Sequence, residues 1–466
     1  MDPSENPLLT DLYQLAMMQA YLDHGDTQTA VFEFFARSLP PRRGFLLAAG
    51  LEQALDYLEN LRFGAADMDW LRSTGHFKDN LLDYLRDFRF AGDVHAMPEG
   101  TAFFADEPIL RVSAPMPVAQ FVETRLINIL HFQSLVAAKA ARCMLAAPGK
   151  LLVDFGLRRA HGAEAGLMAA RASYLAGFAG TATVLAGEKF GIPLYGTMAH
   201  SFIEAFDDEM AAFESFALSR PEGLVLLLDT YDTEAAAKKV VALAPRLKRS
   251  GITIQSVRLD SGDLMKLSNS VRKILDDGGL RKVTIFASGG LDEDALAAFT
   301  RSGAPIDGFG VGTSLTTSSD VPAIDCVYKL QDYAGLPRRK RSEKKATWPG
   351  RKQVWRRYGA DGRMQADILT LDAAGSSAPA RERPGAGEPL IHQVMRGGNR
   401  LRGPETLAAI RERTKRELAR LPEPLRRLDP KATYPVEIAA ELKALAAQVD
   451  RRLEGLAPTT AAKEPG

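Results

Sequence analysis

The stretch Val283 to Leu315, VTIFASGGLDEDALAAFTRSGAPIDGFGVGTSL, decides how the chain folds. It opens with a short apolar run, residues 283–287, of the kind that a buried parallel strand needs. Residues 292–300 then predict a helix with acidic residues in its first turn, where the helix dipole favours them. Residues 306–309 predict a second strand. The stretch therefore has the strand, helix and strand order of an α/β protein.

Both predicted strands end in a loop rich in glycine. The loops contain Ser288, Gly289 and Gly290 after the first strand, and Gly310, Gly312 and Thr313 after the second. Because glycine has no Cβ, its backbone N–H group can approach a phosphate oxygen closely. Glycines can also serve only to make tight turns. Two such loops at adjacent strand ends favour a phosphate site, which in a (β/α) barrel usually lies on the last two loops.

The same alternation extends over residues 151–315. Short apolar segments there end in polar or glycine residues, and predicted helices such as 234–249 and 265–276 lie between several of them. This pattern predicts a parallel α/β barrel or a doubly wound sheet, with catalytic groups at the carboxyl ends of the strands.

The chain is long enough for two to three domains. We expect an N-terminal α/β domain over residues 1–117, in which 90–117 form a small β-rich module, and a catalytic barrel over 118–325. Residues 326–466 are expected to return to the N-terminal domain. This C-terminal region contains a predicted linker at 373–387, helices at 404–421 and 436–453, and a disordered tail at 457–466.

The composition is that of an ordinary globular protein, with 466 residues, 46% hydrophobic and 25% charged. A net charge of +1 gives no global field to recruit nucleic acid or a membrane. Two cysteines cannot form a disulfide framework or a Cys-rich zinc site. With no signal peptide or membrane-spanning segment evident, we expect a cytoplasmic protein. The basic run at 338–345 could contact nucleic acid, but a solvated hairpin or a loop near a polyphosphate is favoured.

Charged side chains follow the strand predicted at residues 252–257. Asp260 and Asp263 enclose Ser261, and such a group can hold ribose hydroxyls or the Mg²⁺ of a polyphosphate. Arg258 supplies a planar fork for a carboxylate or a phosphate. Structural salt bridges remain an alternative interpretation of these residues.

Two earlier strand ends add further candidates. Phe155 and Arg158 lie in the segment DFGLRR, which again combines an acidic residue with cationic forks. His200 follows a predicted strand at 194–196. A lone histidine is more often structural than catalytic, but its place at a strand end near candidate phosphate loops favours a functional role.

The motifs together resemble the nicotinate phosphoribosyltransferase family. TDLYQ, DFGLRRAHG, FAGTATV, GTMAHSF, VRLDSGDL, ASGGLDE and GFGVGTS occur in this order, and the resemblance covers roughly residues 8–360. It implies an N-terminal α/β domain with a β-rich module and an irregular parallel α/β barrel. It also implies an ATP-coupled ligase that needs Mg²⁺, and a homodimer with shared active sites. The reaction would make nicotinate mononucleotide and pyrophosphate from nicotinate and phosphoribosyl pyrophosphate, in the salvage of nicotinate into NAD.

The resemblance also implies a role for individual residues. His200 matches the histidine that ATP phosphorylates, and Arg258 and Asp260 match further catalytic positions. The positions that match nicotinate contacts are Tyr13, from the partner subunit, with Phe155, Thr197 and Arg258. Those that match the phosphoribosyl pyrophosphate site are Arg158, Asp260, Ser261, Asp263, Ser288, Gly289, Gly290, Gly310, Gly312 and Thr313. Asp260 and Asp263 match the Mg²⁺ region.

The sequence disfavours three alternative functions. The nicotinamide-using relatives carry an acidic residue where this chain has Ala182, and a carboxylate there would repel nicotinate. The decarboxylating, quinolinate-using relatives are usually much shorter and need several basic residues for two carboxylates. A non-catalytic sugar-phosphate-binding protein on the same fold is disfavoured by the presence of His200, Arg258 and Asp260.

Overall fold

The computed structural model describes residues 6–342, 345–372 and 387–455. Nearly all of the predicted linker, the predicted tail and residues 343–344 of the basic run lie outside these ranges. The chain divides into two compact units. One combines Met1–Ser134 with Ala323–Gly466, and the other is Leu135–Pro322.

The unit Leu135–Pro322 is built on a six-stranded sheet in which every pair of neighbours is parallel. The strands lie in the order β7 (Gly180–Thr181), β6 (Leu151–Asp154), β11 (Gly308–Val311), β10 (Thr284–Ser288), β9 (Ile254–Leu259) and β8 (Leu224–Leu227). The parallel α/β fold predicted from the sequence is therefore confirmed. The strand predicted at 194–196 is reduced to a single bridge between Leu194 and Thr181.

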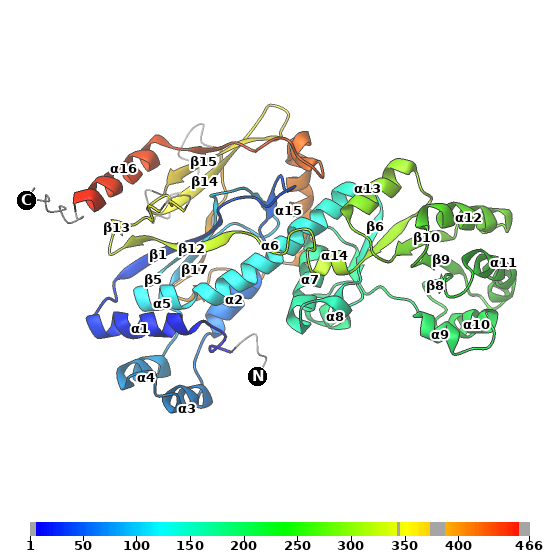
Figure 1. Ribbon diagram of the computed structural model, residues 1–466, viewed down its shortest axis with the longest axis horizontal. Coiled ribbons are helices and arrows are strands. Elements are labelled where there is room, and N and C mark those ends of the chain that lie inside the picture. Colours follow the sequence, from blue (N-terminus) through cyan, green and yellow to red (C-terminus); the bar gives the residue numbers. More distant parts are fainter. Residues whose placement is uncertain (1–5, 343–344, 373–386, 456–466) are drawn as a thin grey trace, which may run out of the picture. The chain divides into compact units, whose positions relative to one another are not determined.

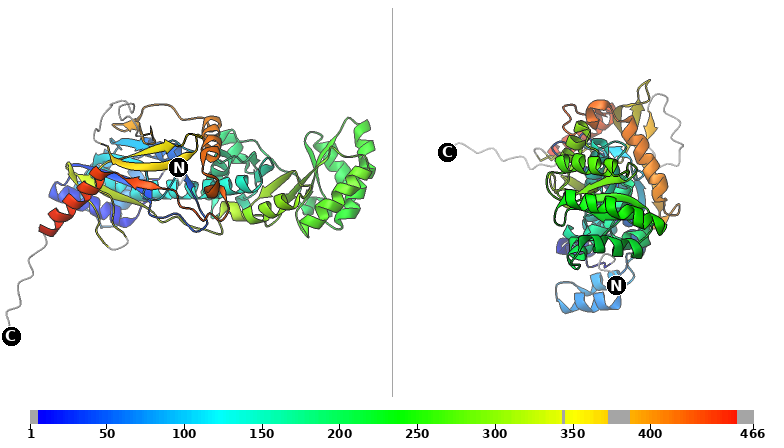
Figure 2. Two further views of the ribbon diagram at one scale, coloured as in Figure 1. Left: turned by 90° about the horizontal axis from the view of Figure 1, so that it is seen from above. Right: turned by 90° about the vertical axis from the view of Figure 1, so that its right-hand side faces the viewer.

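Helices separate the strands of this unit along the chain. They are η2 (Leu157–Arg159), α7 (Ala163–Leu175), α8 (Val184–Phe190), α9 (His200–Glu204), α10 (Glu209–Ser219), α11 (Thr233–Arg249), α12 (Leu264–Asp277), α13 (Glu293–Ser302) and α14 (Thr313–Thr316). Figures 1 and 2 show α11 and α12, in green, packed beside β8, β9 and β10. Their amphipathic pattern explains this placement, because the buried side chains of α12 recur every three or four residues.

A buried ion cluster ties α13 to residues of α6 (Glu123–Ala146) within this unit. Glu293 receives a hydrogen bond of 2.9 Å from Arg142 and forms an ion pair with Lys139, and all three side chains are at most 4% exposed. Lys139 also pairs with Asp320 at 2.7 Å. Removing any one partner would leave a buried charge without its counterpart, so the cluster holds the end of the β10–α13 turn in place.

The other unit contains a seven-stranded sheet and a four-stranded sheet. The first has the order β13 (Leu336–Pro337), β12 (Cys326–Tyr333), β1 (Thr29–Ala36), β5 (Pro108–Pro115), β3 (Asp93–Ala96), β17 (His392–Arg396) and β18 (Asn399–Arg400). The second has the order β16 (Glu388–Pro389), β14 (Lys352–Tyr358), β15 (Met364–Leu371) and β19 (Val436–Ile438), and β2 (Leu46–Leu47) pairs with β4 (Ala102–Phe103).

Helices complete this unit. They are α1 (Leu12–His24), α2 (Leu51–Asn60), α3 (Ala65–Ser73), α4 (Asp79–Arg86), α5 (Met116–Phe121), α15 (Leu407–Arg420), η3 (Glu423–Arg426) and α16 (Ala440–Gly455). Figure 1 shows α16, in red, beside β14 and β15. In the structure described, no helix is both long and apolar enough to cross a membrane.

The C-terminal region joins this unit through strand pairing. β12 pairs antiparallel with β1 over residues 326–333, so chain segments that are distant in sequence share one sheet. The helix predicted from residue 436 is wrong at its start. Val436–Ile438 instead form β19, parallel to β15, and α16 begins at Ala440. The β-branched residues Val436 and Ile438 suit an edge strand once a neighbouring strand is available.

Candidate active site

The carboxyl ends of β6, β9, β10 and β11 meet at one edge of the parallel sheet and surround a cavity of about 150 Å³. The cavity is lined by Phe155, Arg158, Arg159, Arg258, Asp260, Ser288, Gly289, Gly290, Gly310, Gly312 and Thr313. All of these except Arg159 are candidate site residues from the sequence. The parallel topology explains the gathering, since loops after neighbouring parallel strands lie on the same side of the sheet.

Arg258 organises the polar side of the cavity. Its Nε donates to the Ser288 hydroxyl at 2.9 Å, and its Nη2 donates to Asp260 Oδ1 at 2.8 Å. Its Nη1 reaches the Met198 carbonyl oxygen at 3.4 Å. The guanidinium carbon lies 5.6 Å from the centre of the Phe155 ring, within range of a cation–π interaction. Arg258 is thus held in one orientation beside an aromatic face.

Asp260 is the carboxylate of this group. Burial alone would raise the pKa of Asp260, but hydrogen bonds from Arg258 and Ser288 outweigh that effect, and the pKa lies below its ordinary value. Oδ1 accepts both of these hydrogen bonds. Asp260 therefore stays ionised, with its Oδ2 turned toward His200.

Two glycines that line the cavity are required by close packing: Gly289 lies in the loop after β10, whereas Gly310 lies within β11 and not in the loop predicted from residue 310. A Cβ on Gly289 would stand 1.9 Å from the Asp260 carbonyl oxygen, and the residue has a φ of +93°. A Cβ on Gly310 would stand 2.5 Å from the Phe155 ring. Larger residues would therefore displace the carboxylate loop or the aromatic ring. The backbone is exposed at Gly289, whereas Gly310 is buried within β11.

Two exposed arginines stand at the mouth of the cavity. Arg159 Nη1 donates to the Thr313 hydroxyl at 3.2 Å and so connects the loop after β6 with the loop after β11. Arg158 lies beside it on η2. Two guanidinium groups next to glycine loops provide N–H groups that can donate hydrogen bonds to phosphate oxygens.

His200 begins α9 and lies near Asp260. Its Nδ1 forms a hydrogen bond of 3.1 Å with the Thr230 hydroxyl, and its Nε2 is 3.9 Å from Asp260 Oδ2. The ring is partly exposed. Thr197, three residues earlier, donates its hydroxyl to the Val225 carbonyl oxygen at 2.9 Å. The Thr230 contact occupies Nδ1 and leaves Nε2 as the ring nitrogen that faces the carboxylate.

A buried carboxyl group supports the Phe155 loop from below. Asp154 accepts hydrogen bonds from the Thr181 hydroxyl at 2.7 Å and from the Gly156 N–H group at 2.8 Å. Burial raises the pKa of Asp154, although both hydrogen bonds act in the opposite direction. Asp154 shapes the turn that presents Phe155 and does not line the cavity.

Besides Thr197, whose hydroxyl is bound to a backbone carbonyl and which does not line the cavity, three predicted site residues are engaged elsewhere or lie in the other unit. The Ser261 hydroxyl donates to Asp229. Asp263 caps α12, because its Oδ1 accepts from the Lys266 N–H group at 3.1 Å. Tyr13 lies on α1 in the unit that contains the N-terminus, and its side chain is 48% exposed. Their predicted roles remain predictions.

Arg159 and Thr230 both stand in polar segments at predicted strand ends, but the sequence assigned neither a role in the site. Arg159 is adjacent to the predicted Arg158, and only the pairing of β6 with β11 shows that its side chain reaches the second glycine loop. Thr230 follows Asp229 at the end of β8, where the motif LLLDT places a hydroxyl at a strand end. That position was a usable signal, whereas the contact with His200 needed the tertiary structure.

The predicted Mg²⁺ can be tested against the donors that are present. No group of three or more His, Cys, Asp or Glu suited to a metal occurs among the residues that the structure describes. Asp260 keeps one carboxylate oxygen free of Arg258 and Ser288, while Asp263 is used as a helix cap. Mg²⁺ is usually held by one or two carboxylates together with substrate phosphates. The site fits such an ion with Asp260 as its protein ligand.

A parallel sheet whose edge carries paired glycine loops, arginines and an ionised aspartate defines an enzyme that acts on a phosphorylated small molecule. Comparison with known protein families identifies the family to which this enzyme belongs. Residues 8–131 match the N-terminal domain of nicotinate phosphoribosyltransferase, residues 151–334 match the family itself, and residues 351–446 match its C-terminal domain. The chain belongs to the nicotinate phosphoribosyltransferase family, which confirms the resemblance seen in the sequence.

Individual relatives agree with this assignment. A nicotinate phosphoribosyltransferase of Mycobacterium tuberculosis is 47% identical over 434 residues, which cover 93% of this chain and 91% of the relative. The human nicotinate phosphoribosyltransferase is 33% identical over 514 residues, covering 94% and 96%. A crystal structure of human nicotinic acid phosphoribosyltransferase superimposes with a TM-score of 0.84 at 32% identity, covering 95% of this chain and 100% of that one.

Proposed function

We propose that the protein transfers a phosphoribosyl group from phosphoribosyl pyrophosphate to nicotinate, giving nicotinate mononucleotide and pyrophosphate for the salvage of nicotinate into NAD. Family membership supports the reaction class. The observation that carries the proposal is one cavity that joins an aromatic face, an oriented arginine and two glycine loops. These are the groups needed for a pyridine ring, its carboxylate and a sugar phosphate.

Each part of the substrate has a matching surface in the cavity. The pyridine ring would lie on Phe155, where Arg258 stands beside the ring face and offers its charge to the carboxylate. The loops at Gly289 and Gly312 would hold the 5′-phosphate through backbone N–H groups. Ala182 is exposed and uncharged, so it does not repel a nicotinate carboxylate.

The reaction needs little proton transfer from the protein. The ring nitrogen attacks the anomeric carbon, and the bond from that carbon to pyrophosphate breaks with its electron pair leaving on oxygen. Positive charge develops on the ribose ring as pyrophosphate departs. The residues described here position the two substrates and stabilise the leaving phosphates, which accounts for most of the expected rate enhancement. Bound Mg²⁺, held by Asp260, would neutralise charge on the pyrophosphate.

His200 is proposed to couple ATP hydrolysis to this reaction. Displacement at the anomeric carbon does not require a histidine, and His200 presents Nε2 rather than Nδ1 to the region of Asp260. A phosphoryl group on Nε2 would add negative charge beside the substrate phosphates and favour a closed arrangement bridged by Mg²⁺. His200→Ala should abolish substrate-linked ATP hydrolysis but leave slow, ATP-independent transfer. An acid-labile label from γ-labelled ATP that persists in this variant would contradict the role.

A homodimer with shared active sites is the proposed assembly. Tyr13 is exposed on α1, next to the exposed Leu12 and close to the exposed Leu9, so this surface offers an aromatic ring to another molecule. Mixing an inactive Tyr13→Ala chain with an inactive His200→Ala chain should restore activity in hybrid dimers. Failure of verified hybrids to regain activity would show that each site is built within one chain. A cytoplasmic location likewise remains a prediction from the sequence.

The central test is a product assay with nicotinate, nicotinamide and quinolinate, each with and without ATP. We expect nicotinate mononucleotide and pyrophosphate from nicotinate, with ATP increasing the yield, and much slower turnover of the other two pyridines. Preference for nicotinamide or quinolinate would contradict the substrate assignment. Absence of pyrophosphate release with every pyridine would support the alternative of a non-catalytic sugar-phosphate-binding protein.

A further inference from the structure

A second cavity, which we call the basic pocket, lies between the β12–β13 hairpin and α16. It has a volume of about 320 Å³ and is lined by Lys329, Leu330, Arg338, Arg339, Lys340, Thr347, Val449, Arg452 and Leu453. All nine residues belong to the unit that contains both chain ends, whereas the residues of the candidate active site belong to the other unit. The pocket includes the start of the basic run 338–345, which the proposed reaction does not use.

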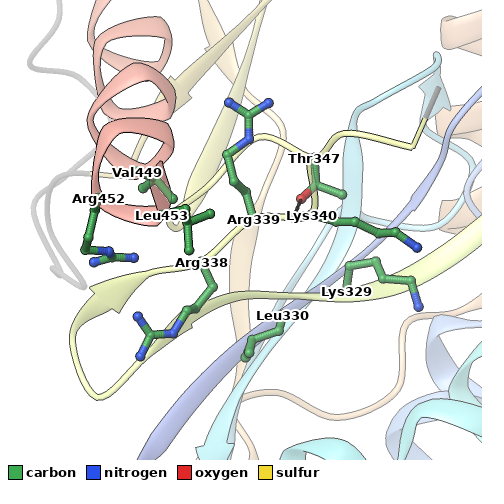
Figure 3. Close-up of a pocket in the computed structure, with 9 residues that line it drawn as sticks. All are labelled: Lys329, Leu330, Arg338, Arg339, Lys340, Thr347, Val449, Arg452 and Leu453. Carbon is green, nitrogen blue, oxygen red and sulfur yellow. Dashed lines mark hydrogen bonds between the residues drawn. The ribbon is translucent and has the colours of Figure 1, made fainter. Parts of the chain in front are cut away.

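Four of the five charged groups of the basic pocket lie on two opposite sides of it, and the guanidinium group of Arg339 lies between them. Figure 3 shows the guanidinium groups of Arg338 and Arg452 on the left and the ammonium groups of Lys329 and Lys340 on the right. In this view the aliphatic side chains of the hairpin and of α16 lie between them. A ligand in the pocket would therefore meet positive charge on these two sides and apolar surface between them.

Most of this positive charge lacks a carboxylate partner. Arg339 pairs with Asp450 at 3.1 Å, and Lys329 has Glu123 at 3.5 Å. Within the described ranges 6–342, 345–372 and 387–455, the side chains of Arg338, Lys340 and Arg452 form no ion pair, although Arg452 donates to a backbone carbonyl group. Unpaired cations around a concave site favour a ligand with several negative charges, and phosphate oxygens are good acceptors for guanidinium forks.

The apolar part of the basic pocket favours a ligand that has an apolar group in addition to its negative charge. Leu330 on β12 and Val449 and Leu453 on α16 give the pocket an apolar part of its lining. Phosphate or pyrophosphate alone would leave this surface in contact with water. A flat heterocyclic ring would cover it and gain the free energy of apolar burial. Phosphates and a ring in one molecule are the chemistry of a nucleotide.

The volume limits the size of that nucleotide. Small-molecule sites usually measure roughly 300–1,000 Å³, so the basic pocket is at the lower end of the range. That is room for one nucleotide unit rather than two. We propose that the basic pocket binds a mononucleotide, with its phosphate on Arg338 and Arg452 and its base over Val449 and Leu453. This inference does not depend on the reaction proposed above.

Direct binding to the full chain tests the proposal. AMP is titrated calorimetrically into the native protein and into the double variant Arg338→Ala/Arg452→Ala. We expect AMP to bind the native protein and the affinity of the double variant to fall at least about tenfold, because two charge-assisted contacts are lost. A control double variant, Lys248→Ala/Arg249→Ala, removes two exposed cations of α11 and should bind AMP normally. Leu453→Glu keeps every cation but should also weaken binding.

The outcomes separate the proposal from simpler explanations. Unchanged melting temperatures of the variants would show that weaker binding is not caused by unfolding. Equal AMP affinity in the native protein and in the Arg338→Ala/Arg452→Ala variant, or no AMP binding at all, would overturn the proposal. Pyrophosphate binding as tightly as AMP would reduce the site to an anion site. Octanoate binding as tightly as AMP would make it a site for acyl anions, and either result would likewise overturn the assignment.

Discussion

Replacing Arg258 with alanine tests the centre of the candidate active site. The side chain holds Asp260 and Ser288 and lies beside the Phe155 ring. Its removal has two separate consequences. Asp260 loses its hydrogen-bonded cation, which affects any substrate, and a bound nicotinate loses the partner of its carboxylate, which affects nicotinate alone.

The size of each consequence follows from the contacts. A hydrogen bond to a charged group contributes about 1.5–3 kcal/mol, and each 1.4 kcal/mol corresponds to about tenfold in rate or affinity. The loss of the Arg258–Asp260 contact should therefore lower kcat/KM roughly 10- to 150-fold for nicotinate and nicotinamide alike. The loss of the carboxylate contact should lower kcat/KM for nicotinate by a similar further factor. Without Arg258, burial should also raise the pKa of Asp260.

The assay measures kcat/KM for both pyridines in the native protein and in Arg258→Ala. Arg301→Ala serves as the control, because it removes an exposed arginine in the last turn of α13 and should leave both values unchanged. Melting temperatures identify any general loss of structure. A fall of equal size for nicotinate and nicotinamide would refute the carboxylate role of Arg258, and an unchanged value for both would remove it from the site.

Three further predictions concern the support of the site. Gly289→Ala should abolish turnover, because its Cβ would stand 1.9 Å from a backbone carbonyl oxygen. Gly290→Ala has open space around its Cβ, so it should keep turnover and lower the free energy of unfolding by only about 1–2 kcal/mol, the penalty for its positive φ. Similar turnover of the two variants would contradict this prediction. Glu293→Gln should lower the unfolding free energy by about 3–5 kcal/mol in urea titrations, since it breaks a buried ion cluster, while the surface substitution Asp277→Asn should change it little. Burial raises the pKa of Asp154, so the stability that its protonated carboxyl group contributes is lost as the pH rises through that pKa, and Asp154→Asn should gain stability relative to the native protein as the pH is raised above about 4, the ordinary pKa of an Asp side chain. A stability difference that does not vary with pH would disprove the last of these.

Most of the candidate site could be predicted from the sequence because each of its motifs is a short, continuous segment. Each glycine loop or charged motif immediately follows an apolar strand, and parallel strands bring such loops to one edge of the sheet whatever their exact order. Gly289, Arg258 and Phe155 were therefore placed together by local pattern alone. The resemblance to a known family added the identity of the substrate, which neither spacing nor composition could supply.

Contacts between distant segments depended on the tertiary structure. The pairing of β6 with β11 brings Arg159 to Thr313, and the position of α9 near the end of β8 brings His200 to Thr230. Residues 436–438 looked helical because the sequence does not show the strand β15 with which they pair. An edge strand is stabilised by its neighbour rather than by its own propensity.

Local periodicity and glycine placement thus determined the α/β fold class and the types of residue that line the cavity. Both signals can be read from the sequence because backbone preferences and side-chain patterning act over a few residues. Only the folded chain decided that Asp263 caps a helix rather than facing the cavity. It also decided that the basic residues near 338 enclose a pocket with α16, about 110 residues further along the chain. Burial and charge pairing at these places are set by partners that approach only in three dimensions, so no short stretch of sequence contains them.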